Sequence, residues 1–170
     1  MYLAQLQEES IKFSEEKLPT IDIKLIILDD NSTNENLTKI LKIFDVYEVN
    51  YEILKHDMTK YEKVIKEQKT KETFSNLSTL LTSFNLGKDS GEDLIFFVED
   101  DYLHFEPMLE EMVASYERIS SQIKSDIFMC PSDYPYLYMN NEKTNVLVGN
   151  KRHWRTVEKT LCTFMTSVNL

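Results

Sequence analysis

Glycine is scarce in this sequence, which has three glycines in 170 residues. Dinucleotide-binding loops of the GxGxxG type and phosphate-binding loops of the GxxxxGK[ST] type need several glycines, so that the backbone can approach phosphate oxygens. Neither pattern occurs in the chain. A nucleotide ligand would therefore have to be bound mainly through carboxylates and a metal ion.

Basic residues, long apolar runs and cysteines are also few. The formal net charge of -10 opposes nonspecific binding to nucleic acid, and we expect no nucleic-acid partner. The longest apolar runs, around residues 25–28 and 94–98, are too short to cross a bilayer, and the first residues do not form a signal-peptide pattern. Cys130 and Cys162 lie in apolar stretches, which predicts buried thiols in a reducing, cytoplasmic compartment.

Strand patterns alternate with helix patterns along most of the chain. Strands are predicted at residues 22–28, 47–54, 93–98 and 127–129. Helices are predicted at residues 2–16 and after a capping box formed by Ser32 and Glu35. Two more are predicted over residues 74–84, with Gly87 as the terminator, and with Pro107 as the first residue. This order predicts an α/β fold with a mainly parallel sheet flanked by helices. Residues 146–148 and 160–166 are predicted to form strands outside the parallel core.

Two acidic clusters follow two of the predicted strands. Asp29 and Asp30 come after the first, followed by an asparagine and Ser32, and the run 99–101 comes after the strand at 93–98. Ligands of open α/β sheets bind beyond the carboxyl ends of the strands, so we expect both clusters to serve one ligand. Three adjacent acids repel one another, and a hard divalent cation would relieve that repulsion.

Both clusters lie in segments that resemble a known family. LIILDDNST resembles the nucleotide-binding segment of inverting, family-2-like GT-A glycosyltransferases, and DLIFFVEDDYLHFEPML resembles their DXD-type metal-binding segment. The resemblance covers roughly residues 2–119. It implies a Rossmann-like GT-A fold in a single domain, 1–170, with a nucleotide-sugar-binding part at 1–125 and the start of an acceptor-side part at 126–170.

The resemblance also implies an activity and its site. Such enzymes move a sugar from a nucleoside-diphosphate sugar to a glycan or lipid-linked acceptor with Mn²⁺ or Mg²⁺, and they build cell-envelope polysaccharides at the inner face of the membrane. By this resemblance Asp30 contacts the base, Asp29 supports the turn, and Asp101 binds the metal. The nucleotide-sugar site would comprise Asp29, Asp30, Ser32, Glu99 and Asp100.

The chain departs from the family pattern at two points. Family members begin with a strand ahead of the first helix, whereas this sequence opens in the predicted helix at 2–16, and no residue matches the family's general base. We therefore expect an incomplete catalytic domain that lacks the first strand. Two alternatives stay open: a noncatalytic remnant that binds a nucleotide or a partner, and a sugar nucleotidyltransferase, although the latter normally carries a glycine-rich basic loop.

Aromatic and polar residues beyond position 130 are candidates for an acceptor site. Asp133 and Tyr134 form one cluster, and Trp154 and Arg155 belong to another. Aromatic faces can hold a sugar, and arginine can bind a phosphate through two parallel hydrogen bonds. The alternative is a tyrosine-rich packing segment followed by a solvated basic turn. For His104, three residues after Asp101, we expect a packing or surface role.

Overall fold

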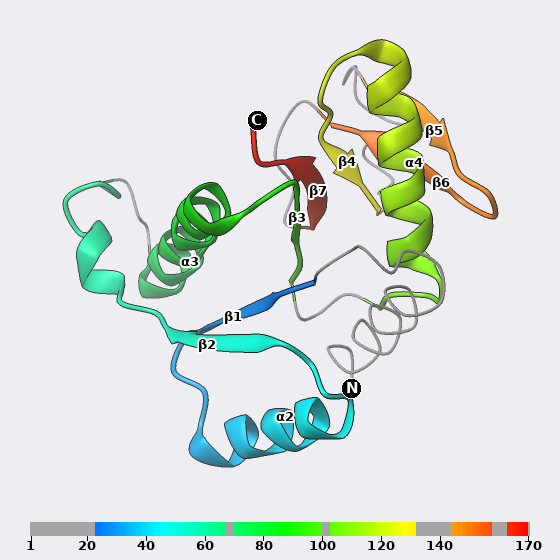
Figure 1. Cartoon of the computed structure of the whole chain (residues 1–170). Coiled ribbons are helices and arrows are strands. Elements are labelled where there is room, and N and C mark those ends of the chain that lie inside the picture. Colours follow the sequence, from blue (N-terminus) through cyan, green and yellow to red (C-terminus); the bar gives the residue numbers. More distant parts are fainter. Residues whose placement is uncertain (1–22, 67–69, 100–102, 132–143, 158–162, 170) are drawn as a thin grey trace. The chain divides into compact units, whose positions relative to one another are not determined.

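The computed structural model describes residues 23–66, 70–99, 103–131, 144–157 and 163–169. These residues divide into two compact units, one ending at Ser90 and the other beginning at Gly91. We call them the parallel unit and the antiparallel unit, after their sheets. The chain is therefore of mixed α/β type, as predicted (Figure 1). The helix predicted at 2–16 lies outside the described residues.

The parallel unit is built on a β-α-β crossover. Strand β1 (Leu25–Asp29) pairs in parallel with β2 (Tyr51–Lys55), in a register that runs from Leu25 opposite Tyr51 to Asp29 opposite Lys55. Helix α2 (Asn34–Val46) connects them, and its fully buried Phe44 packs its ring 4.7 Å from that of Tyr51. Parallel neighbours require such a crossover because a tight turn cannot join them.

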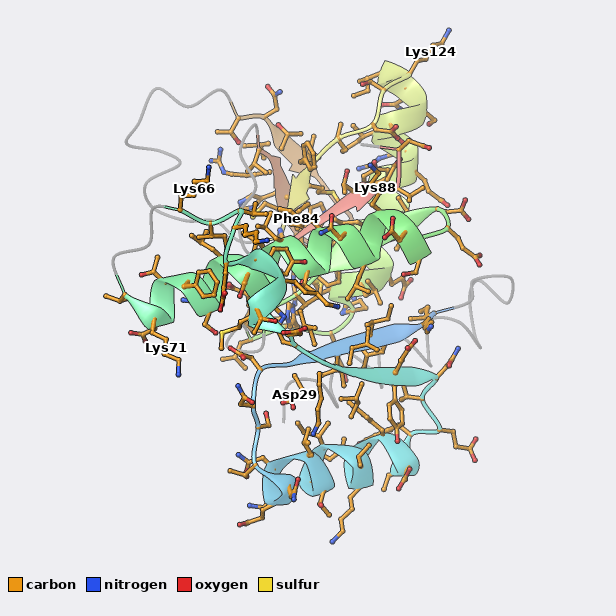
Figure 2. The ribbon with its side chains drawn as sticks, turned by 90° about the vertical axis from the view of Figure 1, so that its left-hand side faces the viewer. Asp29, Lys66, Lys71, Phe84, Lys88 and Lys124 are labelled. Carbon is orange, nitrogen blue, oxygen red and sulfur yellow. The ribbon has the colours of Figure 1, made fainter. Side chains whose placement is uncertain are left out.

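A short 3-10 helix and a long α-helix complete the parallel unit. The 3-10 helix η1 (Met58–Tyr61) follows β2, and α3 (Lys71–Ser90) comes next. Helices α2 and α3 lie on opposite sides of the β1–β2 pair (Figures 1 and 2). Gly87 does not end α3 as predicted, because it keeps a negative φ and the helix continues to Ser90.

The antiparallel unit contains a five-stranded sheet in the order β3-β7-β4-β6-β5. Its strands, in chain order, are β3 (Leu94–Phe97), β4 (Met129–Cys130), β5 (Val146–Val148), β6 (His153–Thr156) and β7 (Phe164–Ser167). All four strand pairings are antiparallel, with Phe97 opposite Phe164 and Val146 opposite Arg155, for example. Strand β7 is therefore the link between β3 and β4.

The larger sheet differs from the mainly parallel arrangement that the sequence predicts. The prediction placed the strands at 93–98 and 127–129 in a parallel core, whereas β3 and β4 are separated by β7, which is antiparallel to both. Strand β5 agrees with the strand predicted at 146–148 outside a parallel core. Only residues 149–152 join it to β6, and a connection that short can join only antiparallel strands. Strand β6 was missed altogether, because its sequence HWRT was interpreted as part of a basic turn.

Helix α4 (Met108–Ile123) supplies much of the core of the antiparallel unit. It begins one residue after Pro107, the predicted first residue, and its C-cap is Lys124, whose φ of 53° is in the left-handed region. Most of the buried apolar side chains of the unit come from α4 and from the sheet, with Ile127 and Val157 just outside the strands: Met108, Leu109, Met112, Val113, Tyr116, Met129, Cys130, Leu147, Trp154, Phe164 and Met165. Cys130 is buried, as predicted, and Cys162 lies outside the described residues.

Candidate functional site at the ends of the strands

Asp29 ends β1 and stabilises the turn that follows it. The residue is only 6% exposed, and its Oδ1 accepts the backbone N–H of Ser32 at 3.0 Å. Its carbonyl oxygen accepts the backbone N–H of His56 at 2.8 Å, which extends the β1–β2 pairing by one bond. Asn31, inside this turn, has a φ of 66°, a conformation that asparagine tolerates better than most residues.

Ser32 does not cap the following helix as the sequence predicts. The N-cap of α2 is Thr33, whose Oγ1 accepts the backbone N–H of Asn36 at 3.3 Å. Ser32 is instead tied through its backbone to Asp29, so the helix begins one residue later. The capping-box spacing between Ser32 and Glu35 identified the start of the helix to within one residue but assigned the wrong cap.

Asp30 differs from Asp29 in its surroundings. Its side chain is exposed, at the carboxyl end of the parallel strand pair. Ser75, from α3, donates its hydroxyl hydrogen to Oδ2 of Asp30, while Oδ1 has a long contact of 3.4 Å with the side-chain amide of Asn31. Two adjacent aspartates therefore have separate tasks: one holds the turn and the other presents a carboxylate to solvent.

A row of hydroxyl groups on α3 meets the carboxyl ends of both strands. Ser75, Ser78 and Thr82 are spaced by three and four residues, which places them on one face of the helix. Ser75 reaches Asp30 after β1, and the fully buried Ser78 lies 2.8 Å from Nε2 of His56 after β2. Figure 2 shows this unit with Asp29 at the end of β1 and Lys71 at the start of α3.

The imidazole of His56 is held on both sides. The Ser78 hydroxyl donates to the carbonyl oxygen of Ser75 at 2.8 Å, so it accepts from Nε2–H of His56. On the other side of the ring, Oγ1 of Thr82 lies 3.4 Å from Nδ1. The Thr82 hydroxyl donates its single hydrogen to the carbonyl oxygen of Ser78 at 2.8 Å and lies 2.9 Å from the hydroxyl of Tyr61. This network was not predicted from the sequence, because the apolar positions of 74–84 predict a helix but do not show what the hydroxyls in SNLSTLLTS would contact. Those hydroxyls, at helical spacing, were the available signal.

Of the second acidic cluster, only Glu99 is among the described residues. It is exposed two residues after β3, and its backbone N–H donates to Oγ1 of Thr163 at 3.2 Å. Asp100 and Asp101 lie outside the described residues, as do Asp133 and Tyr134 of the predicted acceptor site. Within the described ranges, no group of three or more His, Cys, Asp or Glu side chains is placed to hold a metal ion.

Trp154 and Arg155, also predicted for the acceptor site, lie on β6 and are buried. The indole N–H of Trp154 donates to Oγ of Ser115 on α4 at 3.2 Å. Arg155 contacts the hydroxyl of Thr144 at 3.5 Å. The basic run 151–155 is therefore a turn followed by a strand rather than a solvated turn throughout. The role of these residues toward an acceptor stays a prediction.

His104 is buried beside β3, which agrees with the packing role expected of it. The residue is 6% exposed, its ring meets that of Phe96 edge-on at 6.1 Å, and its Nε2 has no hydrogen-bond partner within the described part of the chain. Burial lowers the pKa of His104 below its ordinary value of 6.5. The neutral imidazole is the form compatible with this apolar environment.

We expect the burial of His104 to make the folded state less stable in mild acid. Below a pH of about 6.5 the unfolded chain binds a proton at His104 more readily than the folded chain does, so the free energy of unfolding falls as the pH decreases. In His104→Leu this contribution is lost, and the decrease between pH 7 and pH 5 should be smaller. Urea unfolding at several pH values measures it, with His153→Gln as the control at an exposed histidine. Equal pH dependence in wild type and His104→Leu would contradict the prediction.

Comparison of the chain with protein-family models, with curated proteins and with solved structures gave no match. Among the described helices, none is long and apolar enough to cross a membrane.

Proposed function

We propose that this chain binds a nucleoside-diphosphate sugar and acts as a metal-dependent glycosyltransferase of the GT-A type, with a glycan or lipid-linked acceptor. The observation that carries the proposal is the difference between Asp29 and Asp30. The buried Asp29 accepts the N–H of Ser32 and fixes the turn, while Asp30 offers an exposed carboxylate. These are the roles that the resemblance of LIILDDNST assigns to the two residues.

The position of Asp30 supports a role in nucleotide binding. It lies at the carboxyl end of a parallel strand pair, which is where open α/β sheets bind ligands. A carboxylate is an acceptor only, so it selects groups that offer N–H or O–H, such as the edge of a nucleobase or a ribose. Hydrogen bonds to an ionised acceptor are about twice as strong as neutral ones.

A divalent metal would be held by the acids after β3. Glu99 is exposed there, and carboxylate oxygens are the ligands that Mg²⁺ and Mn²⁺ favour, so the donor set fits the ion. Following the DXD-type resemblance, Asp101 would bind the metal and Asp100 would lie near the ribose. When bound, the ion neutralises the charge that develops on a diphosphate leaving group.

Isothermal titration calorimetry of the full chain tests the proposal. We expect a UDP- or dTDP-sugar to bind when Mn²⁺ or Mg²⁺ is present and to lose most of its affinity in excess chelator, because the diphosphate would then lack its counter-charge. Asp101→Asn and Asp30→Asn should each weaken binding by at least about tenfold, equivalent to about 1.4 kcal/mol.

Asp45→Asn is the matched control, because Asp45 is an exposed aspartate within α2 and lies outside both acidic clusters. Its affinity should stay at the wild-type level. Equal binding with and without chelator would remove the metal from the proposal. Equal losses of affinity in the Asp45 and Asp101 variants would remove Asp101 from the site. A loss of affinity in only one of the Asp30 and Asp101 variants would mean that the two clusters do not bind the same ligand.

A further inference from the structure

The hydrogen bond from Ser75 to Asp30 limits how the Asp30 carboxylate can be used. Ser75 lies on the first turns of α3 and donates its hydroxyl to Oδ2. The side chain of Asn31 reaches Oδ1 only at 3.4 Å, a distance at which a hydrogen bond is weak. The two carboxylate oxygens are therefore unequal: Oδ2 is covered by a protein donor, and Oδ1 is the oxygen open to a ligand.

Nucleobases differ in what they demand of a carboxylate. Guanine presents two adjacent donors, its N1–H and its 2-amino group, and binds a carboxylate best through both oxygens at once. Uracil and thymine present one donor, the imide N3–H, between two carbonyl oxygens that would repel a second bare carboxylate oxygen. A carboxylate with one oxygen open and the other covered by a hydroxyl suits the single imide donor.

We propose that Ser75 is a specificity-determining residue that, by covering Oδ2 of Asp30, directs the site toward uracil or thymine nucleotides and against guanine nucleotides. This inference rests on the proposed nucleotide-binding function and adds the class of base to it. Ser78 supports the arrangement, because it ties the next turn of α3 to His56 after the neighbouring strand. Helix α3 is thus attached to the strand ends by two contacts, Ser75 to Asp30 and Ser78 to His56, and these hold Ser75 close to Asp30.

The base preference is measured by titrating the full chain with UDP and with GDP in the presence of Mn²⁺. We expect wild type to prefer UDP. In Ser75→Ala both oxygens of Asp30 become available, so UDP should bind more weakly, GDP more tightly, and the preference should shrink by about tenfold, the effect of roughly one hydrogen bond. Alanine forms helices better than serine, so the variant is expected to fold.

Two further variants separate the hydroxyl from other effects. Ser75→Thr retains the donor and should retain the preference for UDP. Ser83→Ala removes a hydroxyl on the same helix that donates to the carbonyl oxygen of Thr79 at 3.0 Å, and it should leave both affinities unchanged. If Ser75→Ala binds both nucleotides with the wild-type ratio of UDP to GDP affinity, the role of Ser75 is overturned but the proposed function is not. Failure of wild type to bind either nucleotide would overturn the proposed function as well.

Discussion

Gly149→Ala is expected to destabilise the antiparallel unit by about 3 kcal/mol, since overpacking costs roughly 1–3 kcal/mol and hydrogen bonds to a charged group contribute a similar amount. A Cβ at this position would overlap Oε1 of Glu111 and come within 2.9 Å of both the carbonyl oxygen of Arg152 and Nε1 of Trp154. Glycine is required here by the close approach of a side chain, not by its backbone conformation.

The carboxylate of Glu111 cannot move away from Gly149 without breaking two hydrogen bonds. The residue is 7% exposed, and Oε1 accepts the backbone N–H groups of Lys151 and Arg152 at 2.7 and 2.8 Å. These two bonds attach the β5–β6 turn to α4. An alanine at position 149 would therefore displace either the turn or the carboxylate, and in both cases the two backbone N–H groups would lose their carboxylate acceptor.

Urea unfolding followed by tryptophan fluorescence measures the effect. Trp154 is the only tryptophan in the chain and lies in the affected unit, so the signal reports on that unit directly. Gly87→Ala is the control, because Gly87 lies inside α3, where alanine is favoured by up to about 1 kcal/mol. A stability for Gly149→Ala at or above that of wild type would show that the turn does not approach Glu111 as described.

Tyr116→Phe is expected to destabilise the same unit by about 2–4 kcal/mol, since each buried donor left without a partner costs about 1–3 kcal/mol. Tyr116 is 3% exposed, and its hydroxyl oxygen accepts the backbone N–H of Ser167 at 3.0 Å and that of Ile127 at 3.3 Å. Phenylalanine keeps the ring but leaves both amides unsatisfied. The same burial raises the pKa of Tyr116 above its ordinary value of 10.0.

Denaturant unfolding of Tyr116→Phe should show a lower midpoint with an unchanged dependence on denaturant concentration, because the surface exposed on unfolding stays the same. Tyr47→Phe is the control in the other unit, at a partly exposed position just after α2. A change below about 0.5 kcal/mol in Tyr116→Phe, the range of an ordinary surface substitution, would mean that the hydroxyl does not hold these amides.

Elements with strong local patterns were predictable from the sequence. The nearly continuous apolar runs before Asp29 and before Glu99 correspond to β1 and β3, and the residues at helical spacing correspond to α2, α3 and α4. These patterns arise because one stripe or both faces of an element must be buried, whatever the partner is. The same patterns predicted that the strand stops at Asp29 and Asp30, whereas the different roles of the two residues were implied by the resemblance of LIILDDNST.

Features that depend on contacts between distant segments were not predictable. Strand β6 contains two charged or ionisable residues, and its burial comes from pairing with β4 and β5 and from the contact between Trp154 and Ser115. The hydroxyl face of α3 makes its hydrogen bonds to Asp30 and His56 only because two strand ends from elsewhere in the chain lie against it. Periodicity within one segment carries no information about such partners.

The place of β7 in its sheet has a consequence for the order in which the chain assembles during synthesis. The β-α-β crossover of the parallel unit is closed once residue 55 has been made, so it can form while the rest is still on the ribosome. In the larger sheet, β7 lies between β3 and β4 although it is translated about seventy residues after β3, a span taken from their numbering. Until then β3 has no neighbour among the described strands, and its apolar LIFF segment is an unpaired strand of the kind that is prone to aggregation during folding.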